Sequence, residues 1–380
     1  MVRLFAILSC IFLLYFSGPI IEQKFANSDS VKAIDQVQSK INEIKENPEI
    51  LATINTLSEK MQQLLKKLDL HLKELPLLQQ KDEPTNREKT DLKTPTEQIF
   101  SIHNVELGEA KENIENILGP ANRSTLNEYG AKWYAYHNKY RDFFMVMYDE
   151  KNNVAGLYTN QNLIASTKGI KLGSSKDNVR AKLGEPLTNI QKGLTIYQLQ
   201  KNSDYDVFLL DGVYVTIFYD IHENNTITAM QLINNDMEQK KHELYSEASP
   251  ALKEGFEYQL FDLTNASRVE HQLPILSWDN RFRETARNHS TDMAVNQYFD
   301  HTNLKGQSPF DRMKEDHIIF YLAGENLAYG QFSSIFAHEG LMNSLGHRKN
   351  ILRNGYEYLG VGVAFNDQSQ PYYTENFYAN

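Results

Sequence analysis

The stretch LMNSLGHRKNIL, residues 341–352, places His347 in an apolar and amide-rich phrase close to the end of the chain. Three further acid/base-capable residues lie upstream in short phrases: His289 in RNHSTDMA, His301 in YFDHTN and Glu325 in AGENLAYG. Imidazole and carboxylate groups in apolar surroundings need partners, because burying an unpaired polar or charged group is costly. The four residues therefore predict either a mutually satisfied buried cluster or a ligand site.

Helix-start signals surround these phrases and place His289 on a helix. Ser249 followed by Pro250 is typical of a helix start, and Asp279 and Ser333 are candidate caps of two further helices. His289 falls on the apolar face of the helix that begins near Asp279, which favours a structural role for this histidine in the core.

Two apolar runs close the chain. Residues 359–365 and 372–378 predict β-strands, and the turn-forming segment 366–371 between them predicts an antiparallel pair. Helices followed by this strand pair predict a C-terminal domain of the α+β class over residues 250–380.

Residues 99–245 contain an internal repeat. The motif Leu-Gly-x-x-Lys-x-Asn begins at Leu107 and again at Leu172, and each copy is followed by a Leu-Gly pair. The repeat predicts a duplicated small α+β module. The histidines of this region share no metal-ligand spacing, so binding or docking is its natural role, and it is an alternative partner-binding part of the chain.

Each copy of the repeat predicts one short helix followed by strands. The helices are expected over residues 111–118 and 176–183, with Gly119 and Gly184 as their C-terminal caps. The clearest strand candidates are residues 143–148 and 214–219.

Residues 1–21 predict a signal anchor or a signal peptide. Arg3 precedes an apolar run from Leu4 to Ile21, which lies between the ~20 residues of a membrane span and the roughly 7–15 of a signal-peptide core. An uncleaved segment would make a single-pass protein of the cell membrane with an extracytoplasmic C-terminus. A cleaved one would make the protein secreted.

Residues 22–98 predict a helical stalk and a polar linker. Apolar residues at alternating spacings of three and four from Ile50 to Leu68 form a heptad-like seam, and Pro84 and Pro95 lie in the polar stretch that follows. The seam predicts either an amphipathic helix that packs on its own domain or a coiled-coil homodimer.

Composition excludes several classes of function. The 380 residues carry a formal net charge of -10, which argues against nucleic acid as a partner. The single cysteine, Cys10, lies in the N-terminal apolar run. Disulfide bonds within the chain, thiolate zinc sites and a cysteine nucleophile in a soluble domain are therefore excluded.

Six phrases together resemble the CAP superfamily of cysteine-rich secretory, antigen 5 and pathogenesis-related proteins. They occur in the family's order: HSTDMA, YFDHTN, GENLAYG, LMNSLGHRKNIL, YLGVGVAF and YYTENF. The phrase GHRKNIL is similar to the bacterial branch, and residues 99–245 resemble the CAP-associated N-terminal domain. The resemblance implies that residues 250–380 form an α-β-α sandwich with a surface cleft.

In many members of the family two histidines and two glutamates line that cleft. His301 matches the first histidine and Glu325 the first glutamate. The later histidine is replaced by Tyr372, and the second glutamate by Ser344. His347 is a candidate substitute for the missing histidine.

The resemblance also implies roles for residues beyond His301, Glu325 and His347. Glu339 is a candidate substitute for the missing glutamate, and Leu341 stands where the family has a tryptophan. Tyr372 joins His301, Glu325 and His347 as a predicted cleft residue. Structural roles are predicted for His289, Asn326 and Asn350.

Two functions of different classes follow. The first is a non-enzymatic surface protein whose cleft binds a lipid, peptide or cell-wall ligand, and the absence of a recognisable nucleophile motif favours it. The alternative is a metal-assisted hydrolase of peptide or cell-wall bonds. His301, Glu325 and His347 would then hold a divalent ion such as zinc, or Glu325 would be the catalytic base.

Overall fold

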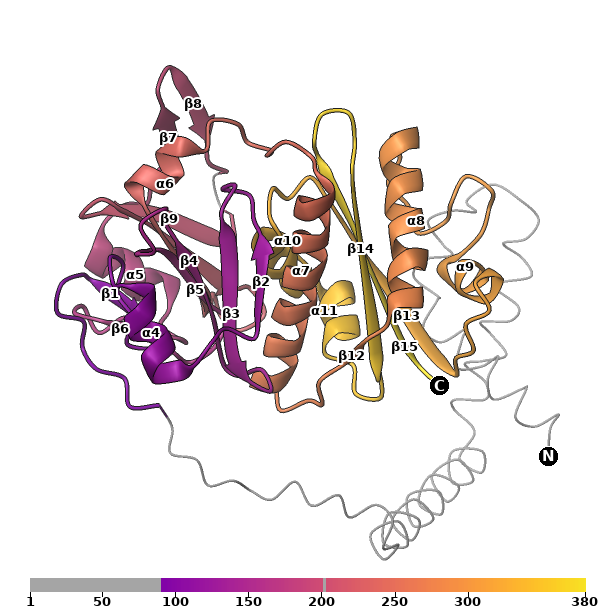
Figure 1. Ribbon diagram of the computed structural model, residues 1–380, viewed down its shortest axis with the longest axis horizontal. Helices are drawn as coiled ribbons and strands as arrows, with labels where there is room; N and C mark the ends of the chain where they lie inside the picture. The colour runs from indigo at the N-terminus through magenta and orange to yellow at the C-terminus, as the bar shows by residue number, and fades with distance from the viewer. Residues whose placement is uncertain (1–89, 201–202) are drawn as a thin grey trace, which may run out of the picture. The chain divides into compact units, whose positions relative to one another are not determined.

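The computed structural model describes residues 90–200 and 203–380 (Figure 1). The predicted anchor or signal segment, residues 1–21, lies outside the described residues, and so does the predicted stalk up to residue 89. Within the described residues, no helix combines the length and apolar character that a membrane crossing requires.

The N-terminal module is built on an antiparallel seven-stranded sheet with the order β2-β3-β4-β5-β11-β10-β9. Pairing of β5 with β11 joins the strands that follow the first predicted helix to those that follow the second. The strands are β2 (Arg123–Leu126), β3 (Lys132–Asn138), β4 (Arg141–Tyr148), β5 (Val154–Thr159), β9 (Tyr205–Leu210), β10 (Val213–Asp220) and β11 (Thr226–Asn234).

Both predicted helices of this module are present with the predicted bounds, as α4 (Lys111–Leu118) and α5 (Lys176–Leu183). Gly119 and Gly184 are their C-caps at φ values of 80° and 86°, a region in which a side chain would be strained. The remaining elements are α6 (Asn235–Lys240) and the strand pairs β1 (Phe100–Ile102) with β6 (Ile164–Ser166) and β7 (Asn189–Lys192) with β8 (Thr195–Gln198).

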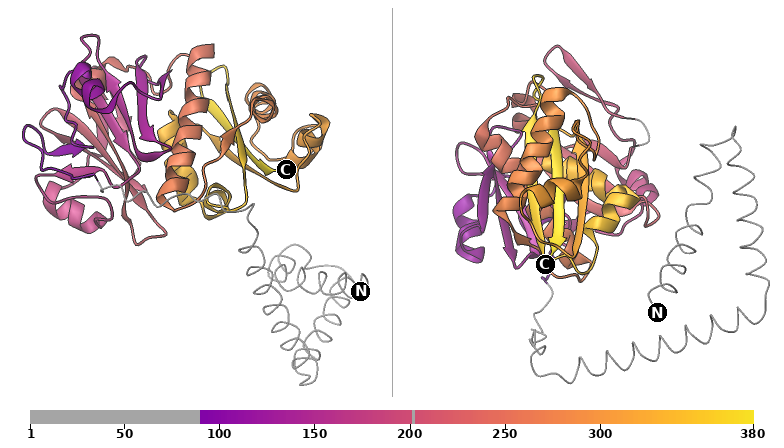
Figure 2. Two further views of the ribbon diagram at one scale, coloured as in Figure 1. Left: turned by 60° about the horizontal axis from the view of Figure 1, so that its bottom comes forward. Right: turned by 90° about the vertical axis from the view of Figure 1, so that its right-hand side faces the viewer.

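The C-terminal region is an α-β-α sandwich, as the sequence predicts (Figures 1 and 2). Its sheet has the order β12-β14-β15-β13, so β13 is an edge strand, and β14 pairs antiparallel with β15 as expected. Helices α8 and α9 cover one face, and α7, α10 and α11 cover the other (Figure 1). The elements are α7 (Pro250–Glu270), β12 (Ser277–Trp278), α8 (Asn280–Asn296), α9 (Pro309–Glu315), β13 (Leu322–Tyr329), α10 (Ser334–Asn343), α11 (Leu345–Ile351), β14 (Tyr358–Phe365) and β15 (Pro371–Ala379).

Local sequence explains where these elements begin and how closely they pack. The predicted caps Ser249, Asp279 and Ser333 each accept a hydrogen bond from a backbone N–H of the first helical turn. Gly362 lets β14 lie directly against α8, because a Cβ there would be 2.1 Å from the backbone nitrogen of Arg287.

Helix α7 is shared by the two regions. Its Gly255 lies against β2 so closely that a Cβ would be 2.1 Å from the carbonyl oxygen of Leu126. The carboxylate of Asp262 accepts a hydrogen bond of 2.8 Å from Tyr140 and forms an ion pair of 3.0 Å with Arg123. One continuous apolar core includes residues of the module and of the sandwich, so the two regions pack as a single body.

Glu339 of α10 is a buried carboxyl group on the same contact surface. Its Oε1 accepts a 2.6 Å hydrogen bond from the hydroxyl of Tyr158 in β5. Burial raises the pKa of Glu339 from 4.5 to about 8, although the hydrogen bond from Tyr158 opposes that rise. The folded protein therefore prefers the protonated form of this group.

Replacement Glu339→Gln tests this preference. The raised folded pKa means that the contribution of Glu339 to stability is fully present below pH 4.5 and is lost as the pH rises to about 8. Glutamine keeps an oxygen for Tyr158 but cannot ionise, so the variant should lose less unfolding free energy between those two pH values. Urea unfolding of the full chain at several pH values measures this difference.

The exposed Glu357 offers the control, since Glu357→Gln should retain the wild-type pH dependence. Burial also raises the pKa of Glu375 to about 7, so part of the slope should persist in Glu339→Gln. A pH dependence identical to that of the wild type would contradict the assignment.

Candidate functional site

The edge-strand site consists of His301, Arg312, Glu325 and His347, which come from four different segments around β13. Glu325 on β13 is central: its Oε1 lies 2.9 Å from His301 Nδ1, and its Oε2 accepts a 2.6 Å hydrogen bond from Arg312 Nη2. The Glu325 and Arg312 side chains are only 2% and 8% exposed, whereas that of His301 is 50% exposed. The site thus has a buried ionic base and an accessible imidazole.

Helix α9 positions Arg312, and Arg312 in turn fixes the loop that carries His301. The helix begins with Ser308 and Pro309, and Ser308 forms a reciprocal capping box with Asp311. Arg312 Nη1 donates to the carbonyl oxygen of His301 at 2.8 Å. One guanidinium therefore holds both the carboxylate of the site and the backbone of its histidine.

The charges explain why Glu325 can be buried at all. An ionised carboxylate without partners would be strongly destabilised there, and both of its oxygens are paired, one with the guanidinium of Arg312. His301 uses Nδ1 for this contact. Its Nε2 has no hydrogen-bond partner among the described residues, so this nitrogen is available to a ligand.

His347 lies on α11 beside this group. Its Nδ1 is 2.8 Å from the hydroxyl oxygen of Ser344. Burial lowers the pKa of His347, and the neighbouring imidazole of His301 lowers it further. The neutral form of the His347 imidazole is therefore favoured, and Asn326, the residue after Glu325, binds the main chain of His347.

Asn326 and Asn350, which the sequence predicts to be structural, tie α11 to β13. Asn326 Nδ2 donates to the carbonyl oxygen of His347 at 3.2 Å and to Glu375 Oε2 at 3.0 Å. Asn350 Nδ2 donates to the side-chain oxygen of Asn326 at 2.9 Å and to the carbonyl of Glu325 at 3.2 Å. This network fixes the backbone positions of the two site residues.

Tyr372 is not a surface residue of the site. It is 3% exposed and packs in a small apolar cluster with Met293 and Leu327. Its ring contacts that of Tyr329, at 4.3 Å between centroids, and Tyr329 is 39% exposed. The predicted role of Tyr372 in lining the cleft therefore conflicts with its burial, and Tyr329 is the tyrosine that reaches the surface.

His289 and Glu339 also lie apart from the site. His289 is buried on α8, as its helical position predicts, with Nε2 donating to the carbonyl of Asp300 at 3.0 Å. Glu339 contacts Tyr158 of the N-terminal module. It does not take the place of a second cleft glutamate, because its carboxyl group is engaged at the contact between the two regions.

Sequence reasoning missed Arg312 and Glu375. The requirement that a buried Glu325 must have a partner pointed to a cation, but no motif singled out Arg312. Glu375 is fully buried on β15 and accepts a 2.8 Å hydrogen bond from Thr264. Its signal was an acidic residue inside the apolar run 372–378.

The predicted metal ligands are not arranged as a metal-binding group. In residues 90–200 and 203–380, no group of three or more His, Cys, Asp or Glu side chains is placed to hold a metal ion. Both oxygens of Glu325 are already used by His301 and Arg312. The donor set His301, Glu325 and His347 thus does not fit zinc in this arrangement.

Two family profiles match the chain. The profile of the CAP-associated N-terminal domain matches residues 107–244, and that of the cysteine-rich secretory protein family matches residues 261–377. Among relatives, the uncharacterized membrane protein YlbC of Bacillus subtilis is 31% identical over 303 residues, covering 74% of this chain and 84% of that protein. The uncharacterized protein YkwD of the same organism is 38% identical over 130 residues, covering 34% of this chain and 49% of that protein.

Solved structures share the fold. An extracellular protein with an SCP domain from Bacillus anthracis superposes with a TM-score of 0.63 at 24% identity, covering 79% of this chain and 99% of that one. A cysteine-rich secretory protein from Staphylococcus aureus gives a TM-score of 0.57 at 16% identity, covering 72% and 91%.

Replacement Arg312→Met should destabilise the protein strongly, because it leaves the buried Glu325 carboxylate without its guanidinium partner. The expected loss in free energy of unfolding is about 3–5 kcal/mol. The double variant Arg312→Met/Glu325→Gln removes the unpaired charge and should recover part of that loss. Urea unfolding of the two variants measures both effects.

The matched control is Arg281→Met, since the Arg281 side chain is 65% exposed, and a change within about 0.5 kcal/mol is expected. If Arg312→Met lost no more free energy of unfolding than this control, pairing with Arg312 would not be what allows Glu325 to be buried.

Proposed function

Because this chain belongs to the CAP family of cysteine-rich secretory proteins and carries the CAP-associated N-terminal domain, we propose that it binds a polar ligand of the cell envelope at the edge-strand site. We place it outside the cytoplasm, tethered to the membrane by its N-terminal apolar segment. The membrane protein YlbC and the extracellular protein of Bacillus anthracis support this location.

The proposal depends on one observation: the site combines a buried ion pair with an accessible imidazole. Glu325 and Arg312 are buried and satisfied, so they form a rigid support. His301 is half exposed and keeps one ring nitrogen for a ligand. A preorganised support with a few accessible polar groups is typical of binding sites.

The surroundings favour a peptide or glycan over a lipid. Phe299 and Tyr329 are 50% and 39% exposed, and their ring centroids are 5.9 Å apart. Phe299 is two residues before His301, and Tyr329 is on the same strand as Glu325. Exposed aromatic faces carried by the same segments as His301 and Glu325 suit the mixed polar and apolar surface of a sugar ring or a peptide.

The arrangement supports binding over hydrolysis. A catalytic base must reach the water that it activates, and both oxygens of Glu325 are occupied by His301 and Arg312. A carboxylate locked in this way serves to orient His301.

Co-sedimentation of the full chain with purified cell-wall sacculi, in the presence of a chelator, tests the proposal. The double variant His301→Ala/His347→Ala removes both imidazoles and leaves the buried Glu325–Arg312 pair in place. We expect about ten-fold weaker binding, equivalent to roughly 1.4 kcal/mol. Thermal unfolding of the variant confirms that it is folded.

The exposed His242 provides the matched control, and His242→Ala should bind as the wild type does. Sacculus binding by the double variant that equals the wild type would contradict the proposal. Fatty-acid binding by the same variants is measured in parallel. If the double variant lost only fatty-acid binding, the ligand would be apolar, and this result would also contradict the proposal.

A further inference from the structure

Helices α10 and α11 meet at a single residue, Ser344, which is the C-cap of one and the N-cap of the other. A serine at an N-cap ordinarily accepts a hydrogen bond from a backbone N–H of the first turn. Ser344 makes no such bond, and its hydroxyl pairs with Nδ1 of His347 instead. The orientation of the His347 ring is thereby linked to this junction.

The residue before the junction, Asn343, is held by the N-terminal module. Its Nδ2 donates to Asp204 Oδ2 at 2.7 Å and to the carbonyl of Tyr219 at 2.9 Å. Its Oδ1 accepts a 3.1 Å hydrogen bond from the backbone nitrogen of Ile221, and its carbonyl oxygen lies 3.0 Å from Nε2 of His222. The module therefore engages the side-chain amide and the main chain of one residue.

A second contact holds the residue that follows His347. Arg348 Nη1 donates to Asp220 Oδ2 at 2.7 Å, and the two side chains are only 12% and 8% exposed. A charge-assisted hydrogen bond with little exposure is stronger than an ordinary surface ion pair. The end of β10 thus binds both α11, through Arg348, and the end of α10, through Asn343.

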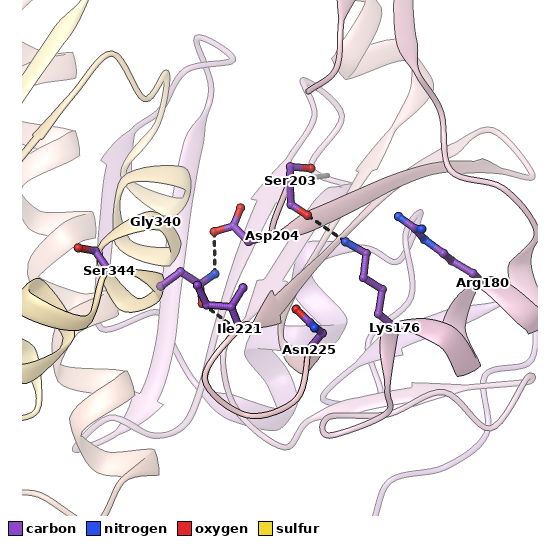
Figure 3. A pocket seen from close by; sticks show the side chains of 9 residues that line it. Lys176, Arg180, Ser203, Asp204, Ile221, Asn225, Gly340 and Ser344 are labelled. Atoms are coloured by element: carbon purple, nitrogen blue, oxygen red, sulfur yellow. Dashed lines mark hydrogen bonds between the residues drawn. The ribbon is translucent and has the colours of Figure 1, made fainter. Parts of the chain in front are cut away.

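Open space flanks these contacts. A cavity of about 550 Å³ lies on one side, lined by Asp204 and Ser344 among others (Figure 3). Another of about 420 Å³ is lined by Asp220 and Arg348. On the sides that face these cavities, polar contacts with the module hold the junction, while Leu341 and Ile351 of the same two helices are buried in the apolar core.

We propose that the N-terminal module positions His347 through Asn343 and Arg348, so that the module controls the geometry of the edge-strand site. The site is then incomplete without the module, although no residue of the module is part of it. The effect of these contacts on affinity rests on the proposed function, but their effect on the His347 ring does not.

Reaction with diethylpyrocarbonate, which modifies neutral imidazole, tests the coupling in the full chain. The rate at His347 is followed by mass spectrometry across pH, with the exposed His317 as internal reference and His301 recorded in parallel. The variants are Asn343→Ala and, from the module side, Asp204→Ala. Asp177→Ala, an exposed change on α5 of the same module, is the control.

Both variants should raise the plateau rate at His347 by about 2- to 30-fold, the range that such coupling produces. The pH at which the modification rate of His347 is half-maximal should rise toward that of an ordinary histidine, because the ring leaves its half-buried position. The control should match the wild type. If Asn343→Ala does not fold, Asp204→Ala decides alone, since it removes one contact and leaves the sandwich sequence unchanged.

A lower unfolding temperature with unchanged reactivity of His347 in the folded variants would overturn the coupling and leave the contacts as structural only. That outcome does not depend on the proposed function. The proposed function fails separately if the double variant His301→Ala/His347→Ala leaves sacculus binding unchanged. Sacculus binding of Asn343→Ala should fall in step with the change in reactivity.

Discussion

Glu325 is a carboxylate on an edge strand, and its burial requires that both oxygens be paired. Arg312 of α9 and His301 of the loop before α9 supply these two partners. Arg312 then also binds the backbone of His301. A single constraint on one acidic group therefore determines the conformation of the loop, the orientation of the imidazole and the nitrogen that remains accessible.

The same logic operates where the module meets the sandwich. Helix α7 is buried on nearly all sides, yet it carries Asp262, Ser267 and other polar residues. Some of these groups are paired across the contact: Tyr140 donates to Asp262, and Asn160 donates to Ser267. Polar pairs between well-packed apolar areas specify one arrangement of the two regions, because any shift would leave buried groups unpaired.

Much of the fold followed from local signals in the sequence. Caps at Ser249, Asp279 and Ser333 and glycines at 119 and 184 predicted helix ends that the structure contains. These signals are local because they reflect hydrogen bonds and backbone angles within one turn.

The composition of the site could be predicted only in part, because its partners are distant in sequence. His301 and Glu325 came from short motifs, but Arg312 is known only from the packing of α9 against β13. Tyr372 was assigned to the surface from its place in a motif, whereas strand pairing puts its ring into an apolar cluster. The engagement of Glu339 by Tyr158 depends on a contact between residues 181 positions apart.

We propose that two imidazoles on a support that needs no metal recognise a polar ligand. Histidine NMR of the full chain, with muropeptides added in the presence of a chelator, measures this most directly. The ring resonances of His301 and His347 should move, while those of the buried His289 and His338 should remain in place. Unchanged resonances of His301 and His347, or changes that require added zinc, would contradict it.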